Sequence, residues 1–426
     1  MKKRILAVIL TVCMAAAMMP TMAFAANEDI FTTDGIRYRI IDETAATVEV
    51  IHPTTEEQLN PPKSSYSGDI TIPAAVEYNS KNYTVIGIAP FAFIDAEISS
   101  ITLNEGLQYI DGAAFAGSAL KSITIPASVI RLGGGKNSTS VFSPNSNDPC
   151  VLEELTFAEG SQLKEICVSG TDGAFKNCDS LQTVQIPAGV TDLYLGQIVV
   201  TPGQKYLGIF NGWDNAKNVT FADGSPFENV DGILYGGDTL IAALDEQITS
   251  VTVREGTTEI GDSAFYMCTE LADIVLPEGL ETIGDDAFNY APNVDLILPP
   301  IPGLPPAAGS EPANAVTRIN IPSTVTSVGT NFLKGGLKDD GSSVVVMQGP
   351  QPPTFGTGVF ASASSSSPYQ VRIYYPAVAE AAYTDTNYAL ASYINSNTSS
   401  DPDTEITFDL PLSNTAVTVG NTATVT

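Results

Sequence analysis

The side chains that most often carry out catalysis are scarce in this chain. His52 is the single histidine among 426 residues, and no nucleophile motif stands near it. Ser-His-Asp and Cys-His chemistry both require a histidine held against the nucleophile, so the sequence supports neither mechanism. We expect His52 to be an ordinary surface residue of the N-terminal region.

Carboxylates are abundant, and glycoside hydrolysis needs only two of them. The chain has 48 Asp and Glu residues, but most stand at turn positions of a repeat, where solvation explains them. Examples are Glu105, Glu278, Asp285 and Asp286. The run Asp339–Gly341 lacks the spacing of an EF-hand calcium loop. We therefore predict a protein that is not an enzyme, with no catalytic residue, no cofactor and no metal site.

The cysteines fall into two groups. Cys178 and Cys268 each stand three residues after a phenylalanine of the repeat. A buried free cysteine behaves as a small hydrophobe, so we expect these two side chains to fill the inside of a turn. Cys150 and Cys167 lie in an irregular stretch, and a disulfide between them is left open. No Cys-x-x-Cys pair is present, so zinc is not expected.

The elements that must position these residues belong to one repeated phrase, which recurs about nine times between Asp69 and Pro376. Phe265 and Phe288 stand 23 residues apart in two clear copies. A period in the low twenties is the signature of a stacked leucine-rich solenoid. The sequence predicts a mainly β fold of about nine coils of 22–23 residues, with a parallel β-sheet on one face and a cap at each end.

Each copy contains a short strand of the Ile-x-Ile type. Its two flanking aliphatic residues point inward and its middle residue points to solvent, because side chains alternate along a strand. A proline often follows and ends the strand, then a second aliphatic pair and a turn glycine such as Gly284 or Gly329. The strands are Ile70–Ile72, Ile101–Leu103, Ile123–Ile125, Leu155–Phe157, Val184–Ile186, Val219–Phe221, Val251–Val253, Ile274–Leu276, Leu296–Leu298 and Ile319–Ile321.

Several long phrases are similar to a known family. They read GDITIPAAVEYNSKNYTVIGIAPFAF, VDGILYGGDTLIAAL, IGDSAFYMC and VRIYYPAVAEAAY, in this order. From Tyr66 to Tyr393 the chain resembles the BspA-like leucine-rich repeats of bacterial secreted and cell-surface proteins. That resemblance implies adhesion to host or neighbouring cells and brings no catalytic signature. The chain departs from the family pattern near 133–150, 195–215 and 299–314.

The N-terminus agrees with export. Three basic residues, Lys2 to Arg4, precede an apolar run from Ile5 to Met19, and Ala23-Phe24-Ala25 offers a cleavage site. We predict a signal peptide over 1–25 and no membrane insertion after its removal. Cleavage changes the net charge from −29 to −32, and a chain this acidic is repelled by nucleic acid and anionic membranes.

The remaining organisation follows from composition. We predict an N-terminal cap over 26–69, the solenoid with its C-terminal cap over 70–395, and a polar linker over 396–404. Residues 405–426 alternate Thr and Val like the first strands of a β-sandwich. About twenty residues cannot bury a core, so we expect the natural protein to continue and this domain to be truncated.

A binding site is expected on the solvent face of the sheet, because solenoids use that extended surface for partners. Threonine dominates its middle column and suits a wet β surface. Val275 and Ile297 break that rule in adjacent coils, flanked by Asp273 and Asp295. We predict that this patch contacts a partner, or that the proline-rich insertion at 299–314 covers it.

Two functions follow from these predictions. The first is a monomeric extracellular adhesion or recognition module, secreted or at the cell surface, that binds a protein or a glycan through the solenoid surface. The alternative is a structural spacer within a longer surface protein whose recognition or catalytic module lies beyond residue 426. No nucleic-acid partner is expected in either case.

Overall fold

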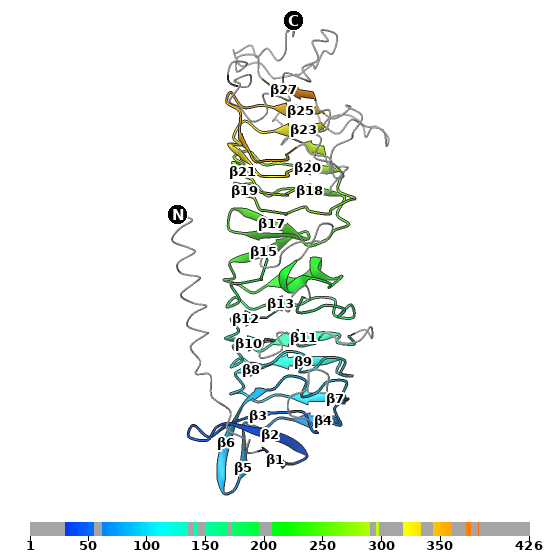
Figure 1. Ribbon diagram of the computed structural model, residues 1–426, viewed down its shortest axis with the longest axis vertical. Coiled ribbons are helices and arrows are strands. Elements are labelled where there is room, and N and C mark those ends of the chain that lie inside the picture. Colours follow the sequence, from blue (N-terminus) through cyan, green and yellow to red (C-terminus); the bar gives the residue numbers. More distant parts are fainter. Residues whose placement is uncertain are drawn as a thin grey trace, which may run out of the picture.

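The structure is a computed structural model, and its described residues form an elongated stack of short coils (Figure 1). It describes residues 30–54, 62–134, 140–142, 150–167, 173–195, 207–289, 295–297, 318–333, 344–359, 372–375 and 382. The predicted signal peptide, proline-rich insertion, linker and β-sandwich segment lie outside these ranges. Within them, the helical turns that span several residues are η2 (Gly208–Phe210) and η3 (Ala216–Asn218).

The first sheet contains the ten predicted Ile-x-Ile strands, and all of its hydrogen-bonded neighbours run parallel. Its strands are β4 (Ser67–Thr71), β7 (Glu97–Thr102), β9 (Ser122–Ile125), β11 (Glu154–Phe157), β13 (Gln185–Ile186), β14 (Thr220–Phe221), β18 (Ser250–Thr252), β20 (Asp273–Val275), β22 (Asp295–Ile297), β23 (Arg318–Ile321), β25 (Val344–Met347) and β27 (Arg372–Tyr374). The predicted β solenoid is thereby confirmed. β25 and β27, which read Val-Val-Val-Met and Arg-Ile-Tyr, are not among the strands predicted from the sequence.

Hydrogen bonding in the first sheet is interrupted. β4 pairs with β7, β9 pairs with β11 and β13 pairs with β14, whereas β18 begins a continuous six-stranded ladder that ends at β27. β7 and β9 are neighbours in the stack but share no ladder. This break positions the hollow described below.

A second sheet, which was not predicted, lies opposite the first and consists of two hydrogen-bonded blocks, one ending at Ile166 and the other beginning at Phe227. Its strands are β8 (Tyr109–Ile110), β10 (Arg131–Leu132), β12 (Glu165–Ile166), β19 (Glu259–Ile260), β21 (Thr282–Ile283), β24 (Ser327–Val328) and β26 (Thr354–Phe355). They arise at the second aliphatic pair of each copy, where Leu132, Ile283 and Val328 point inward and are buried. Two residues are too few for alternation to reveal a strand from sequence.

Antiparallel hairpins extend this second sheet in two places. At the N-terminal end, β1 (Ile30–Thr33), β2 (Ile36–Asp42) and β3 (Thr47–Val50) lead to β6 (Lys81–Ile88), which also pairs with β5 (Ala75–Tyr78). In the middle, β15 (Phe227–Val230), β16 (Ile233–Gly236) and β17 (Thr239–Ala243) form a meander that joins β19. The second group is the phrase that interrupts the repeat at 230–244.

The core lies between the two sheets and contains the phenylalanines of the repeat. Phe93, Phe115, Phe265 and Phe288 are at most 2% exposed. Cys178 and Cys268 are both 0% exposed, which confirms their predicted place inside the turns. Each coil therefore buries its apolar residues only because neighbouring coils cover them.

His52 is not the surface residue that the sequence suggested. It is 3% exposed, its Nε2 lies 2.9 Å from the carbonyl oxygen of Pro62, and its Nδ1 accepts the Thr54 amide at 3.2 Å. Burial lowers the pKa of His52. The chain returns over this position, where the hydroxyl of Tyr66 donates to the carbonyl of Ile51, and no local pattern in the sequence indicates that return.

Candidate functional site

The outward face of the first sheet is lined by hydroxyl groups. Thr102, Thr124, Thr156 and Thr252 are exposed, as the alternation of the repeat predicts. The hydroxyls of Thr124 and Thr156 lie 2.9 Å apart on neighbouring strands. Such a surface offers donors and acceptors at the regular spacing of a parallel sheet.

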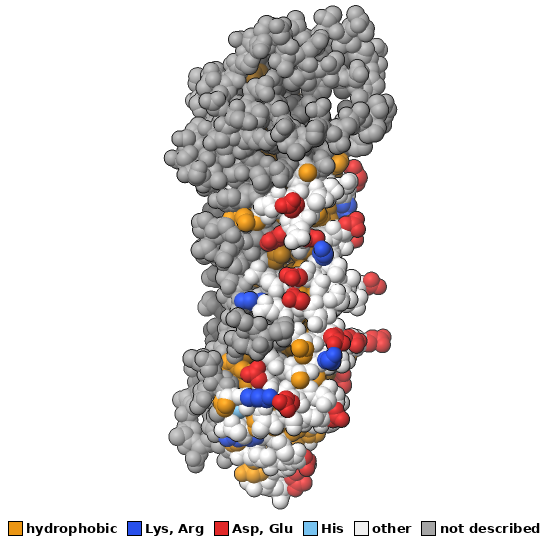
Figure 2. Space-filling model, turned by 90° about the vertical axis from the view of Figure 1, so that its right-hand side faces the viewer, with side chains coloured by type: hydrophobic (Ala, Val, Ile, Leu, Met, Phe, Trp, Pro, Cys, Tyr) orange, Lys and Arg blue, Asp and Glu red, His pale blue; other side chains and the backbone are white. Residues whose placement is uncertain are grey.

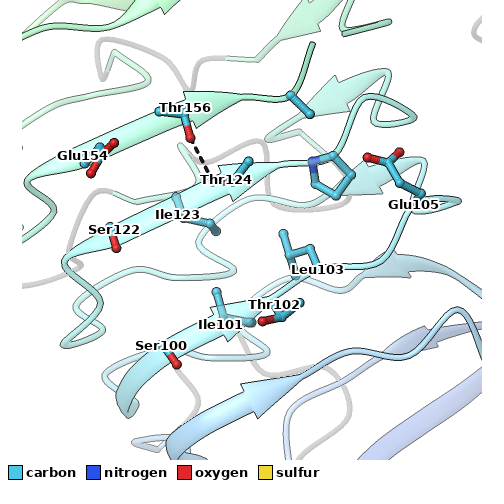
Figure 3. A pocket seen from close by; sticks show the side chains of 12 residues that line it. Ser100, Ile101, Thr102, Leu103, Glu105, Ser122, Ile123, Thr124, Glu154 and Thr156 are labelled. Carbon is cyan, nitrogen blue, oxygen red and sulfur yellow. Dashed lines mark hydrogen bonds between the residues drawn. The ribbon is translucent and has the colours of Figure 1, made fainter. Parts of the chain in front are cut away.

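A hollow of about 350 Å³ opens on this face where β7 and β9 share no ladder (Figure 3). Hydroxyls line it from three strands, and the half-buried Ile101 and Leu103 and the buried Ile123 form apolar parts of its wall. Figure 3 shows these side chains on successive strands, with Glu105 beside the hollow. The residues that line it are Ser100, Ile101, Thr102, Leu103, Glu105, Ser122, Ile123, Thr124, Pro126, Glu154, Thr156 and Ala158.

The carboxylates at the hollow do not form a catalytic pair with a base or nucleophile. Glu105 accepts the amides of Ala127 at 3.2 Å and Ser128 at 3.3 Å, so it ties its turn to the next coil. Glu154 is exposed on β11. The lining contains no histidine, cysteine or lysine, and its chemistry suits reversible hydrogen bonding.

The predicted patch lies on the same sheet, several coils further along. β20 pairs with β22 in a register that sets Asp273 opposite Asp295 and Val275 opposite Ile297. Val275 is half-buried. The side chains of Asp273, Asp295 and Ile297 lie outside the described residues, as does the insertion at 299–314, so their role in binding stays a prediction.

A row of charged and aromatic side chains on the outer face of the second sheet was missed from the sequence. We call it the charged row; its members at successive register positions are Arg39, Glu49, Tyr109 and Arg131, with Asp111 beside them. Gly87 occupies the register position between Glu49 and Tyr109. Tyr109 and Arg131 each directly precede an inward aliphatic residue, and that shared repeat position is the signal that could have identified them.

The side chains of the charged row are linked by hydrogen bonds and an ion pair. Arg39 Nε donates to Glu49 Oε1 at 2.8 Å, and the Tyr109 hydroxyl donates to Glu49 Oε2 at 2.9 Å. Arg131 Nη1 lies 2.6 Å from Asp111 Oδ1, and its guanidinium stands 5.2 Å from the ring centre of Tyr109. Glu49 is 3% exposed. These contacts fix the row as part of the scaffold.

Burial dominates the electrostatics of this row. It raises the pKa of Asp111 to about 6, against the opposing effect of Arg131. It also raises the pKa of Tyr109, with a further contribution from the nearby Glu49. Because burial shifts these pKa values, the contribution of the charged row to stability depends on pH in a way that a surface ion pair would not show.

Two structural findings concern other kinds of function. In the part of the chain that the structure describes, no three His, Cys, Asp or Glu side chains gather as metal ligands would. Within the same residues, no helix has the length and apolar character needed to cross a bilayer.

The repeat matches a family model. The model described as "BspA type Leucine rich repeat region" matches six copies, over residues 75–197 and 243–304. These residues are BspA-type leucine-rich repeats. The family resemblance predicted from the sequence is therefore confirmed over these two blocks. The hollow lies within the first block of BspA-type repeats, and β20 and β22 lie within the second.

Several solved structures align with most of this chain at low sequence identity. The pneumococcal vaccine antigen PcpA is 18% identical, with 87% of this chain and 97% of that chain covered and a TM-score of 0.47. A leucine-rich cell surface protein from Faecalibacterium prausnitzii A2-165 is 15% identical, with 84% and 97% covered and a TM-score of 0.36. A leucine-rich repeat protein from Bacteroides ovatus ATCC 8483 is 17% identical, with 79% and 92% covered and a TM-score of 0.34. No curated protein matches the chain.

Proposed function

We propose that this protein is a non-enzymatic extracellular recognition module that binds a protein or glycan of a host or neighbouring cell. One observation carries the proposal: the outward face of the first sheet is exposed, lined by hydroxyls and hollowed between β7 and β9. A hollow that combines apolar wall atoms with a few polar groups suits reversible binding. The BspA-type repeats support a protein-interaction role.

The polar groups on the two outer faces of the molecule differ, and the difference favours the first sheet as the binding surface. In the charged row, Glu49 and Arg39 bond each other and Arg131 pairs with Asp111, so these groups contribute to the scaffold. The hydroxyls of Thr102 and Ser122 are exposed on the first sheet. A ligand that bonds to exposed hydroxyls displaces only water, without breaking an ion pair of the protein.

The proposal that the protein is not an enzyme rests on the geometry of the hollow and of His52. His52 is buried in the N-terminal region and bonded to the carbonyl of Pro62. The hollow offers hydroxyls and two glutamates, and Glu105 is engaged by backbone amides. The Ser100 hydroxyl donates to Asp69 at 2.7 Å, but the lining holds no histidine or lysine to activate a hydroxyl as a nucleophile.

The N-terminal sequence and the net charge support the proposed localisation and class of partner. The basic and apolar N-terminal pattern before Ala25 supports secretion or display at the cell surface. Figure 2 shows carboxylate side chains recurring along one face of the molecule, in agreement with a net charge of −29. Such a surface disfavours nucleic acid as a partner, and we propose that the module acts as a monomer.

The test is binding of the purified protein to immobilised matrix proteins, mucins and glycans at physiological salt. We expect saturable binding at about micromolar affinity to at least one of them. Thr102→Tyr with Thr124→Tyr fills the hollow while keeping residues that suit a strand. Thr252→Tyr, at the same outward column of a later coil, is the matched control.

The outcomes separate the sites. Loss of binding in the Thr102 and Thr124 variant, with Thr252→Tyr unchanged, supports the hollow. Loss in a Val275→Asp plus Ile297→Asp variant instead supports the patch on β20 and β22. If wild type binds and all three variants bind equally well, the proposed face is wrong. An absence of saturable binding across the panel leaves the spacer as the better account.

A further inference from the structure

Two cysteines from different coils lie in contact in the core. The backbone amide of Cys150 donates to the carbonyl of Asn177 at 3.1 Å, which sets Cys150 beside the chain at Cys178. Each thiol perturbs the pKa of the other, in agreement with their being neighbours. They are 6% and 0% exposed and belong to the same hydrophobic cluster.

Cys167 has different neighbours. Its thiol lies among Arg131, Glu165 and Tyr194, and a Cβ on Gly134 would come within 2.9 Å of its Sγ. The Tyr194 hydroxyl donates to Glu165 at 2.7 Å. Cys167 therefore belongs to the outer face of the second sheet, whereas Cys150 is in the core, and the structure does not bring these two together.

We propose that Cys150 and Cys178 form a disulfide when the protein folds in an oxidising compartment. The proposal relies on the exported location proposed above, because disulfides persist outside the cytosol. Its geometric basis is the backbone hydrogen bond from Cys150 to the residue before Cys178, together with the burial of both side chains in one hydrophobic cluster. The structure itself shows both as free thiols.

The chemistry is thiol–disulfide exchange with a small disulfide donor such as oxidised glutathione. Before the coil closes, the Cys150 thiol loses its proton to solvent and attacks one sulfur of the donor, which releases one donor thiolate. Cys178 gives up its proton and attacks Cys150 Sγ; the Sγ–Sγ bond forms, the second donor thiolate leaves, and the two electrons stay on the donor.

Burial determines when this exchange occurs. Neither sulfur is open to a donor in the packed coil, since both residues are nearly or fully buried. Oxidation is therefore coupled to folding, before the coil closes. The bond would join positions 28 residues apart in the chain and would stabilise the folded coil by restricting the unfolded chain.

The experiment refolds the purified full chain in a glutathione redox buffer. Remaining thiols are alkylated in denaturant without reductant, and the peptides are identified by mass spectrometry. We expect a Cys150–Cys178 linked peptide, and a melting temperature roughly 5 °C above that of protein refolded with reductant. Cys268→Ser is the matched control because Cys268 occupies the repeat position of Cys178 in a later coil; it should keep the link.

Other outcomes overturn the proposal. Alkylation of both Cys150 and Cys178 after oxidative refolding, or a link from Cys150 to Cys167, would show that the pair is wrong. Cys150→Ala with Cys178→Ala should remove the effect of redox buffer on melting while the protein still folds under reductant. These readouts need neither a ligand nor export, so they remain informative if the proposed recognition function fails.

Discussion

The rings of Phe93 and Phe115 lie stacked, with centroids 5.2 Å apart and planes inclined by 9°. Phe265 and Phe288 repeat the arrangement at 5.1 Å and 8°. Both pairs are separated by one repeat along the chain, so the same position of the repeat is stacked in neighbouring coils. Stacked phenylalanines thus join neighbouring coils within each of the two large hydrophobic clusters of the core.

Truncation within a phenylalanine stack should be among the most damaging changes. Phe115 contacts Phe93 on one side and Phe142 on the other, so Phe115→Ala leaves a cavity between coils. We expect a loss of about 3–5 kcal/mol in the free energy of unfolding, measured by urea denaturation. Phe227→Ala, at a half-buried position, is the control and should have a clearly smaller effect; equal losses would contradict the role of the stack.

Gly87 leaves room for the ring of Tyr109. A Cβ at Gly87 would lie 2.1 Å from the Tyr109 ring, so Gly87→Ala must displace that ring and break its hydrogen bond to the buried Glu49. We expect a loss of about 2 kcal/mol in unfolding free energy. Adding Tyr109→Ala should make Gly87→Ala nearly neutral. A double-mutant cycle without such coupling would show that the two residues do not compete for space.

Asp111 should make stability depend on pH in the opposite direction to an ordinary ion-paired carboxylate. Its folded pKa of about 6 lies above the ordinary aspartate value of 3.8. The folded state therefore binds the proton more tightly, and the contribution of Asp111 to stability is full below about pH 4 and is lost as the pH rises through 6. The difference between the two pKa values corresponds to about 3 kcal/mol.

The measurement is the unfolding free energy of wild type minus that of Asp111→Asn across pH 4 to 8. Subtraction removes the titration of the other carboxylates. We expect this difference to fall as the pH rises and to be level above pH 7. A difference that rose with pH would mean that Arg131 outweighs burial at this site.

A carboxylate ladder at the turns should contribute modestly. Asp262 Oδ1 accepts the amide of Asp285 at 2.7 Å, and Asp285 Oδ1 accepts the amide of Thr330 at 2.5 Å. Asp285→Ala removes the second bond and should lower the unfolding free energy by about 1 kcal/mol. Asp285→Asn keeps an acceptor and should recover most of that loss. Protection of the Thr330 amide from hydrogen exchange should report the same order.

The local repeat pattern in the sequence was sufficient to predict the structure of a single coil. The spacing of Phe93 and Phe115, the inward Ile123 and Ile125, and the buried Cys178 all follow from a period that repeats within a few dozen residues. Each of these predictions needed only alternation along a strand and the need of every coil to bury an apolar face.

The sequence by itself determined that the chain is a solenoid, which residues face its core and where threonines face solvent. Only the tertiary structure decided how separate coils meet: that His52 is covered by the returning chain, that Tyr109 reaches Glu49, and that Cys150 lies beside Cys178. The physical reason is that these contacts depend on the register between neighbouring coils. Contacts between coils depend on loops of irregular length and on strands of two residues, whose alignment is set by packing and leaves no periodic trace in the sequence.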